Sequence, residues 1–333
     1  MLLKNKIAVI AGDAYGVGHA AAALFAREGA SVVCIDDNAG FENAKTLRLG
    51  EREVPYFHAD VTDSNQVQAV ASACEKMLAR VDILFNIAGR GAIRQAFEAT
   101  TEETWATMIG RNLTGGFLCG KYFLPLMKNA ESGSIINHGS IDGFLGNPSI
   151  AAYSAAKGGV MPLSHVMAHD LSKYRIRVNS ISTGGIRPTP APGSVRDEAR
   201  IAVTPSQRMG TAEDVAKVAL FLASDLASYV NGANIVCDGG RKGGVAVQHH
   251  CQAFAVGAVD GVERLVRVEG DVLHLDRLFQ QVGRLHLAHI DEVRGAQARK
   301  IFLGHNRRHR TASFDFTTPG SPGGSNGRAF QPA

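Results

Sequence analysis

The chain has few cysteines and no long uncharged apolar run, and these two shortages exclude several classes of protein. Only 5 of the 333 residues are cysteine, and no two of them form a Cys-x-x-Cys pair. A dispersed, odd set of cysteines is typical of reduced thiols, so we expect a cytoplasmic protein without disulfides or a bound metal. No stretch reaches about 18 apolar residues without a charge, so no membrane span is expected. The first expected strand begins at residue 6, which leaves no room for a signal peptide.

The chain also lacks a strong excess of either charge. It has 35 Lys and Arg residues against 31 Asp and Glu residues, a formal net charge of +4. Nucleic-acid binding surfaces need clustered positive charge, and so small an excess over this length does not provide it. We therefore expect no nucleic-acid partner. The apolar content of 45% is ordinary for a soluble globular chain.

Short apolar runs alternate with helical stretches along the first three quarters of the chain. The predicted strands are 6–11, 31–35, 54–58, 82–86, 134–138, 176–182 and 234–237. The predicted helices are 17–28, 40–49, 64–79, 101–129, 152–173 and 212–223. Seven strands with intervening helices predict an α/β fold, a doubly wound (Rossmann) seven-stranded parallel sheet with helices on both faces. We expect this domain to occupy residues 1–244.

The first strand is followed by a glycine-rich turn, a helix and a second strand. The turn contains Gly12, Gly16 and Gly18 in the spacing Gly-x-x-x-Gly-x-Gly. Glycines allow the backbone to approach a pyrophosphate, and the N-terminus of the next helix offers N–H groups and the positive end of its dipole. The pattern predicts a dinucleotide-binding site.

The second strand ends in Asp36, and this residue bears on which dinucleotide binds. A carboxylate at that position accepts hydrogen bonds from a ribose 2′-hydroxyl and repels a 2′-phosphate. Asp37 is expected to add to the repulsion, and Tyr15 in the glycine turn supplies no cation to offset it. The sequence therefore favours NAD over NADP. The alternative is that Asp36 only caps the following turn.

Tyr153, Lys157 and Ser140 form the most informative constellation. Tyr153 and Lys157 are four residues apart, so they share one face of a helix. A neighbouring ammonium favours the ionised phenol and is expected to lower the pKa of Tyr153, which suits proton exchange with an alcohol or ketone. Ser140 can donate a hydrogen bond to the same substrate oxygen. The alternative is a solvated helix face carrying a chance Tyr/Lys pair.

Six motifs in this order resemble those of the short-chain dehydrogenase/reductase family, in its shorter single-domain branch. The matching segments are Ala11-Gly12-x-x-x-Gly16-Val17-Gly18, Asp60-Val61, Asn86-Ile87-Ala88-Gly89, Arg111-Asn112-Leu113, the set Ser140, Tyr153 and Lys157, and Asp238-Gly239-Gly240. The resemblance covers residues 1 to about 244. It implies an oxidoreductase acting on a secondary alcohol or ketone, and Asp36 makes NAD the expected coenzyme.

The resemblance also implies the roles of individual residues. Lys157 would bind the nicotinamide ribose, Tyr153 would exchange the proton, Ser140 would orient the substrate oxygen and Asn112 would hold a water in a proton relay. The implied coenzyme contacts are Gly12, Tyr15, Gly16, Val17, Gly18, Asp36, Asp60, Val61, Asn86, Ala88, Gly89, Tyr153, Lys157, Gly184 and Ile186. Helices 101–129 and 152–173 would pair with a second copy, which implies a homo-oligomer, a dimer or usually a tetramer.

The substrate side of the site is less clearly encoded. The wall at 141–145 is mostly apolar and the flap at 186–206 contains four prolines, which suggests a hydrophobic or cyclic secondary alcohol or ketone. Asp142 could bond a substrate hydroxyl or cap a turn, and Arg187 could pair with an anionic group or be solvated. The family's usual proline after its sixth strand is Thr183 here, which frees φ and is expected to loosen that loop.

Residues 245–333 differ in composition, with ten arginines, one lysine and seven of the twelve histidines. The alternation over 265–275 predicts a short β-hairpin, and the Gly-, Pro- and Ser-rich end over 317–333 is expected to be disordered. Three interpretations stay open: a small β module for assembly, a metal or nucleic-acid element, and an appendage without selected structure.

The same motifs disfavour three rival functions. An epimerase or dehydratase of the longer branch has a different glycine spacing, and an enoyl reductase places its tyrosine and lysine further apart. A catalytically weak NAD-binding scaffold or sensor would not need Asn112, Ser140, Tyr153 and Lys157 together.

Overall fold

The computed structural model describes residues 1–12, 16–38, 45–87, 89, 91–187 and 195–242, with the side chains of residues 195 and 196 omitted. The chain divides into two units, 1–248 and 249–333, and every described residue belongs to the first. The predicted boundary after residue 244, the predicted tail hairpin, and the expected coenzyme residues Tyr15 and Ala88 all lie outside the described residues.

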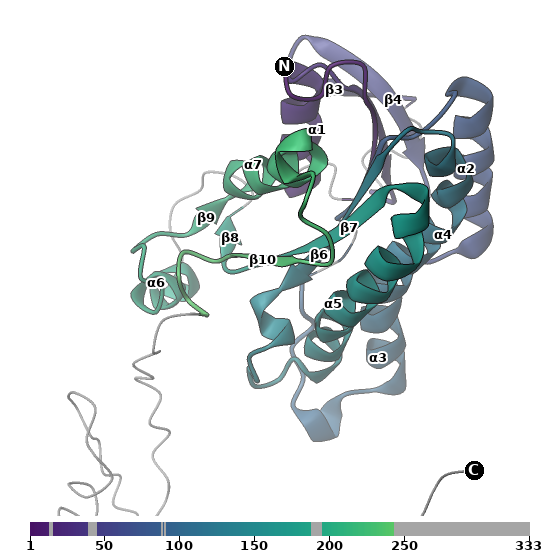
Figure 1. Ribbon diagram of the computed structural model, residues 1–333. Coiled ribbons are helices and arrows are strands. Elements are labelled where there is room, and N and C mark those ends of the chain that lie inside the picture. Colours follow the sequence, from purple (N-terminus) through teal and green to yellow (C-terminus); the bar gives the residue numbers. More distant parts are fainter. Residues whose placement is uncertain (13–15, 39–44, 88, 90, 188–194, 243–333) are drawn as a thin grey trace, which may run out of the picture. The chain divides into compact units, whose positions relative to one another are not determined.

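An eight-stranded sheet forms the centre of the fold (Figure 1). Its strands, in spatial order, are β10 (Asn234–Cys237), β7 (Ile176–Thr183), β6 (Gly133–Ser140), β5 (Ile83–Asn86), β1 (Ile7–Ala11), β2 (Ser31–Asp36), β4 (Arg52–His58) and β3 (Thr46–Leu49). All neighbouring pairs are parallel except β3 with β4. The predicted seven parallel strands are confirmed, and one antiparallel strand is added at the edge.

That added strand corrects the helix expected over 40–49, which is wrong for residues 46–49. In β3, Leu47 and Leu49 are buried while their neighbours are exposed, which is the period-two pattern of a half-buried strand. Gly50, at φ 65°, then reverses the chain so that Leu49 pairs with Arg52. A left-handed conformation at this turn suits glycine, which bears no side chain to clash.

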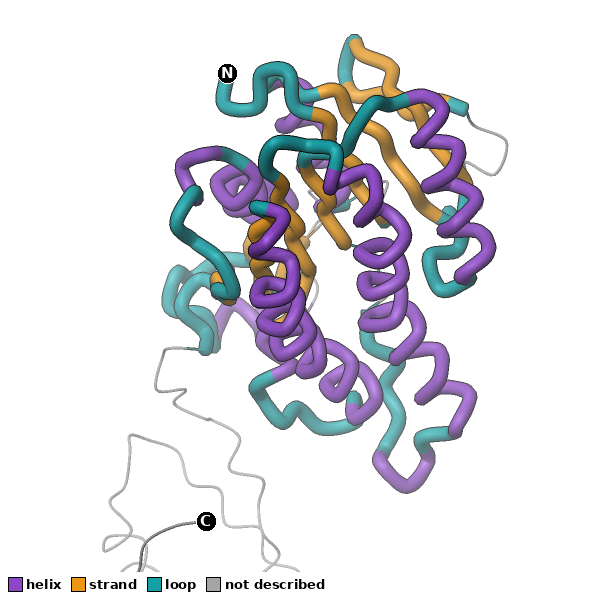
Figure 2. Tube along the Cα trace, turned by 45° about the vertical axis from the view of Figure 1, so that its right-hand side comes forward, coloured by secondary structure: helices purple, strands orange, loops and turns teal. Residues whose placement is uncertain are grey.

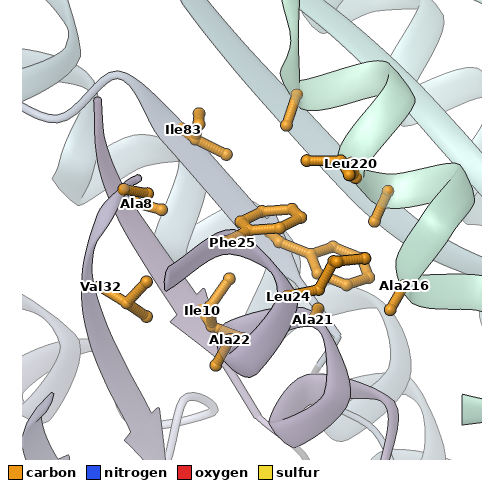
Figure 3. Packing of buried hydrophobic residues seen from close by; sticks show 14 of the residues in the cluster. Ala8, Ile10, Ala21, Ala22, Leu24, Phe25, Val32, Ile83, Ala216 and Leu220 are labelled. Atoms are coloured by element: carbon orange, nitrogen blue, oxygen red, sulfur yellow. The ribbon is translucent and has the colours of Figure 1, made fainter. Parts of the chain in front are cut away.

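Helices cover both faces of the sheet (Figures 1 and 2). The helices are α1 (Val17–Arg27), α2 (Ser64–Met77), α3 (Glu102–Ile109), α4 (Gly115–Lys128), α5 (Ala151–Leu171), α6 (Val195–Ala202) and α7 (Ala212–Ala223). The apolar cluster on one face joins α1 and α7 to the sheet, and the cluster on the other face joins α2, α4 and α5 to it. Figure 3 shows Phe25 of α1 within the first cluster, together with Ile83 of β5 and Leu220 of α7. None of the helices that the structure describes combines the length and apolar character needed to cross a bilayer.

The helix predicted over 101–129 is interrupted. Residues 110–114 form a single π-helical turn between α3 and α4. Such turns insert an extra residue into the helical ladder and occur often at functional sites. Asn112 lies within the turn and is buried.

The flap predicted over 186–206 contains more structure than its prolines indicated. Strand β8 (Ile186–Arg187) pairs in parallel with β9 (Gly210–Thr211), and α6 lies between them in the chain. The carboxylate of Asp197 in α6 forms an ion pair with the guanidinium of Arg187, at a distance of 3.1 Å. This ion pair joins the helix to the small sheet.

The strand order contains a switch point at β1. Strand β1 lies between β2 and β5, so the order of strands reverses there. In open α/β sheets, ligands bind outside the carboxyl ends of the strands at this switch point. Gly12 follows β1 and Asn86 ends β5, so both predicted coenzyme residues lie at the carboxyl end of the sheet beside this switch point.

Candidate active site

Gly12 directly follows β1, and Gly16 directly precedes α1. Gly12 has φ 105°, a conformation that favours glycine, and its N–H donates to the carbonyl of Ile35 at 2.6 Å. Gly16 is the N-cap of α1 and has no side chain to cap it, and the first helical turn contains no acidic residue. The positive end of the helix dipole is therefore not neutralised by a side chain of its own first turn, which suits an anionic pyrophosphate.

Asp36 and Asp37 differ in their surroundings. One carboxylate oxygen of Asp36 accepts a hydrogen bond from the N–H of Asp37 at 2.8 Å. The carboxylate of Asp37 instead pairs with Arg111 at 2.6 Å, and a second nitrogen of Arg111 lies 4.0 Å from the carboxylate of Asp60. The guanidinium offsets the charge of Asp37, which weakens the contribution expected of Asp37 to repulsion of a 2′-phosphate. Sequence reasoning missed Arg111, although it directly precedes Asn112 in the quoted motif.

Gly89, Asn112 and Lys157 meet at the carboxyl end of β5. A Cβ placed on Gly89, at φ 155°, would lie 2.6 Å from Oδ1 of Asn112 and 3.4 Å from Nζ of Lys157. The amide nitrogen of Asn112 donates to the carbonyl of Met108 at 3.1 Å, whereas its Oδ1 is buried without a hydrogen-bond partner among the described residues. A glycine at this position thus leaves open a narrow space lined by a buried acceptor and an ammonium.

Asn86, at the end of β5, is fixed by hydrogen bonds just before the segment that contains Gly89. Its side-chain nitrogen donates to Oδ1 of Asn137 at 2.8 Å and to the carbonyl of Gly116 at 3.3 Å, and Asn137 in turn donates to the hydroxyl of Ser164 at 2.9 Å. Asn86 is only 4% exposed. This amide network links β5, β6, α4 and α5, so Asn86 holds the loop from within the core.

Ser140 and Tyr153 are brought together at the end of β6. The hydroxyl of Ser140 lies close enough to the phenol of Tyr153 to favour its ionised form. The Ser140 oxygen also accepts the N–H of Asp142 at 3.1 Å. Asp142 accepts a short hydrogen bond from the side chain of Asn147, which supports a turn-forming role for this carboxylate.

Two glycines let the loop carrying Ser140 approach α5. A Cβ on Gly143 would lie 2.8 Å from the carbonyl carbon and oxygen of Lys157 and from the nitrogen of Gly158. A Cβ on Gly158 would lie 3.2 Å from the carbonyl oxygen of Gly143. Backbone therefore packs directly on backbone, and this contact fixes Ser140 against the helix that bears Tyr153.

The expected lowering of the Tyr153 pKa by Lys157 is wrong for the chain without coenzyme. Burial raises the pKa of Tyr153 above its ordinary value, and the hydrogen bond from Ser140 offsets only part of that effect. Burial also lowers the pKa of Lys157 to about 7, so its positive charge is already incomplete near neutral pH. Lys157 donates instead to the carbonyl of His138 at 2.8 Å.

The residues after β7 form the last border of the site. The N–H of Gly184 donates to the carbonyl of Cys237 at 3.0 Å, and a Cβ on Gly184 would lie 2.8 Å from that of Asp238. Ile186 begins β8, where it pairs with Gly210. Arg187, a candidate for substrate binding, points its guanidinium at Asp197.

A sequence profile described as Enoyl-(Acyl carrier protein) reductase matches residues 11–242. The crystal structure of a short-chain dehydrogenase/reductase from Burkholderia xenovorans matches with a TM-score of 0.66 at 33% identity, covering 73% of this chain and 98% of that chain. The chain belongs to the short-chain dehydrogenase/reductase family. Uncharacterized oxidoreductase YxbG of Bacillus subtilis is 40% identical over 251 residues, covering 72% of this chain and 91% of YxbG. Trans-4-hydroxycyclohexanecarboxylate dehydrogenase of Sinomonas cyclohexanicum is 36% identical over 251 residues, covering 72% of this chain and 94% of that protein.

Members of the short-chain dehydrogenase/reductase family typically use NAD or NADP, and the residues present fit such a coenzyme. The glycine turn and the N-terminus of α1 suit the pyrophosphate, Asp36 suits the adenosine ribose, and the space left by Gly89 suits the approach of a ribose to Lys157.

Sequence reasoning missed two residues beside the reacting group. His138 touches Lys157 through its carbonyl, and the positive charge of Arg200 in α6 favours ionisation of Tyr153. Arg200 lies 47 positions along the chain from Tyr153, so only the fold brings it near. His138 lies only two residues before Ser140 in the sequence, and this proximity could have indicated that it borders the candidate site.

Proposed function

We propose that the chain is an NAD-dependent dehydrogenase or carbonyl reductase that acts on secondary alcohols and ketones. The observation that carries the proposal is that Ser140 lies beside Tyr153, one helical turn from buried Lys157, at the carboxyl end of the sheet. The spacing of four residues between Tyr153 and Lys157 favours carbonyl chemistry over enoyl reduction. Relatives that act on alcohols, such as the hydroxycyclohexanecarboxylate dehydrogenase, support the same reaction class.

Ser140 orients the substrate oxygen. Because its oxygen already accepts the N–H of Asp142, its own proton is available to donate either to Tyr153 or to the substrate. A hydrogen-bond donor aimed at the position where negative charge develops stabilises the transition state. The same hydroxyl thereby aligns the substrate oxygen with the phenol.

Tyr153 exchanges the proton with the substrate oxygen, as a base in oxidation and as an acid in reduction. Its raised pKa favours the protonated phenol, which is the form required to reduce a ketone. Oxidation of an alcohol needs the phenolate, which a charged Lys157 stabilises. The buried acceptor Oδ1 of Asn112 can hold either the ammonium of Lys157 or a water that passes the proton outward. The bound coenzyme supplies the hydride acceptor or donor.

Asp36 supports NAD as the coenzyme. Asp37 is paired with Arg111, so we assign the discrimination at the ribose chiefly to Asp36, which ends β2. The half-buried apolar residues Phe144 and Leu145 after Ser140 support a hydrophobic or cyclic alcohol, in keeping with the cyclohexane ring in the name of the Sinomonas relative's substrate. Asp142 and Arg187 stay candidates for substrate contact, although each already has a partner within the chain.

Exposed apolar side chains support assembly into a homo-oligomer. Phe117 of α4 is 47% exposed and Val166 of α5 is 59% exposed, and both helices cover the same face of the sheet. Burial of such side chains against a second copy would remove apolar area from water. We therefore propose α4 and α5 as the contact helices.

The decisive experiment is turnover of NAD with a panel of linear and cyclic secondary alcohols, followed by NADH absorbance. Tyr153→Phe should lower kcat by about 10²- to 10⁴-fold while NADH binding is retained. Tyr229→Phe is the matched control, because Tyr229 is fully exposed. Equal turnover by the Tyr153 variant would overturn the catalytic assignment, and NADH binding without any turnover would favour the scaffold alternative.

A further inference from the structure

We propose that His138, in the strand β6 that ends at Ser140, is a positioning residue that joins Lys157 of α5 to the coenzyme-side loop after β7. The inference rests on the proposed function, since the loop concerned carries the expected coenzyme residues Gly184 and Ile186.

His138 makes two contacts with different parts of the site. Its carbonyl accepts the hydrogen bond of the Lys157 ammonium at 2.8 Å. Its imidazole Nε2 lies 3.0 Å from the hydroxyl of Thr183, the last residue of β7. One residue of β6 therefore contacts both α5 and the point at which the chain leaves the sheet.

The sheet register explains why these side chains meet. His138 pairs with Ile181, and Ser140 pairs with Thr183. The imidazole thus reaches diagonally, by two residues along β7, to the register partner of Ser140. Diagonal neighbours on one face of a sheet lie within reach of long or aromatic side chains.

Thr183 replaces a proline that would itself restrain the backbone. The sequence alone therefore predicts a looser loop, yet Thr183 is only 6% exposed and its hydroxyl is bonded. The next residues, Gly184 and Gly185, bring no side chain to hold the loop. The hydrogen bond from His138 supplies at Thr183 a restraint that a proline ring would otherwise impose.

The imidazole is suited to this role because it stays neutral. Burial lowers the pKa of His138 well below 6.5, and the nearby Lys157 lowers it further. A neutral imidazole has one donor and one acceptor nitrogen, and a threonine hydroxyl can serve as either partner. The bond therefore persists in either tautomer.

Matched substitutions test the pair by NADH affinity, which can be measured without turnover. His138→Leu and Thr183→Val each remove the hydrogen bond, whereas His138→Gln keeps a polar group near the position of Nε2 and Thr183→Ser keeps the hydroxyl. His138→Leu and Thr183→Val should each raise the Kd of NADH about fivefold, the usual worth of one neutral hydrogen bond. His138→Gln and Thr183→Ser should change it less than about twofold. KM for NAD should follow the Kd while kcat changes less, because the catalytic side chains are untouched.

The double variant His138→Leu/Thr183→Val decides whether the two residues act together. Its Kd should equal that of either single variant, since both remove the same bond. Three results would each overturn the proposal. The first is a double-variant Kd raised by the product of the two single effects. The others are a Kd for His138→Gln as high as that for His138→Leu, and an unchanged Kd in the single variants. Should Thr183→Val not fold, Thr183→Ala takes its place in the cycle. Normal NADH binding with no alcohol oxidised by the unaltered protein would count against the proposed function and leave the test of His138 intact.

Discussion

Lys157 donates a hydrogen bond from its ammonium to the main-chain carbonyl of His138, at 2.8 Å. The lysine is only 3% exposed, and no acidic partner contributes to its pKa, which burial lowers to about 7. The group that the proposed mechanism uses in its charged form is thus held in an environment that favours its neutral form.

The first prediction concerns stability and pH in the coenzyme-free protein. Between about pH 7 and pH 10.5 the unfolded chain binds a proton at Lys157 that the folded chain has released, so the free energy of unfolding should rise with pH by up to about 1.4 kcal/mol per unit. Below pH 7 both states are protonated, and the cost of burying the charge is fully present. Lys157→Met should remove this pH dependence.

Urea unfolding at pH 7, 8.5 and 10 measures the effect. The stability of the unaltered protein relative to Lys157→Met should increase across the series, while Lys76→Met, at an exposed lysine of α2, should follow the unaltered protein. A constant difference between the unaltered protein and Lys157→Met would contradict the lowered pKa.

The second prediction concerns coenzyme choice. Asp36→Ala should shift the ratio of kcat/KM for NADP over NAD by at least about tenfold, the worth of a hydrogen bond to a charged group. Adding Asp37→Asn should shift it further, because Arg111 then loses the nearer of its two carboxylate neighbours and can face a 2′-phosphate. Asp36→Glu keeps the charge and is the control. Retained NAD preference in Asp36→Ala would assign discrimination to another residue.

The third prediction concerns the space beside Gly89. Gly89→Ala should lower both stability and turnover, because its Cβ would come within 2.6 Å of Asn112 at a φ of 155°. Strained backbone and an overpacked contact together cost about 2–4 kcal/mol. Gly91→Ala, where a Cβ meets nothing within 4 Å, should be close to neutral. Thermal unfolding and NAD turnover of the pair decide the matter, and equal behaviour of the two variants would show that the space is not needed.

The fourth prediction concerns Ser140. Ser140→Ala should lower kcat by about 10²-fold or more through loss of the donor to the substrate oxygen. It should also raise the pKa of Tyr153, because the hydrogen bond that lowers it is lost. The pH profile of kcat for alcohol oxidation should therefore move to higher pH, and an unmoved profile with full activity would argue against contact between the two hydroxyls.

The fifth prediction concerns assembly. Val166→Glu should dissociate the proposed homo-oligomer, because a charge at a buried apolar contact is strongly unfavourable. Met77→Glu, at a 50%-exposed position of α2, is the control. Sedimentation velocity distinguishes the species, and an unchanged particle mass for Val166→Glu would move the contact surface elsewhere.

Much of the fold followed from local pattern. The seven predicted strands coincide with β1, β2, β4, β5, β6, β7 and β10, because buried parallel strands are short apolar runs bounded by turn residues. Strand β3 was assigned to a helix, since four alternating residues carry too little periodicity to separate the two. The π turn at residues 110–114 and the helix α6 within the flap also escaped prediction. Both depend on contacts with distant parts of the chain.

For the candidate site, the sequence by itself determined which chemical groups are present: a glycine turn, an acid after β2, and Ser140, Tyr153 and Lys157 at their spacing. The tertiary structure decided their state. Burial set the direction of the pKa changes of Tyr153 and Lys157, and it reversed the direction predicted for the tyrosine. Packing of the elements also formed the ion pair between Arg111 and Asp37 and the hydrogen bond between His138 and Thr183. Spacing along a chain specifies which side chains share a helix or strand, whereas solvent exclusion and contacts between elements exist only after the elements have packed.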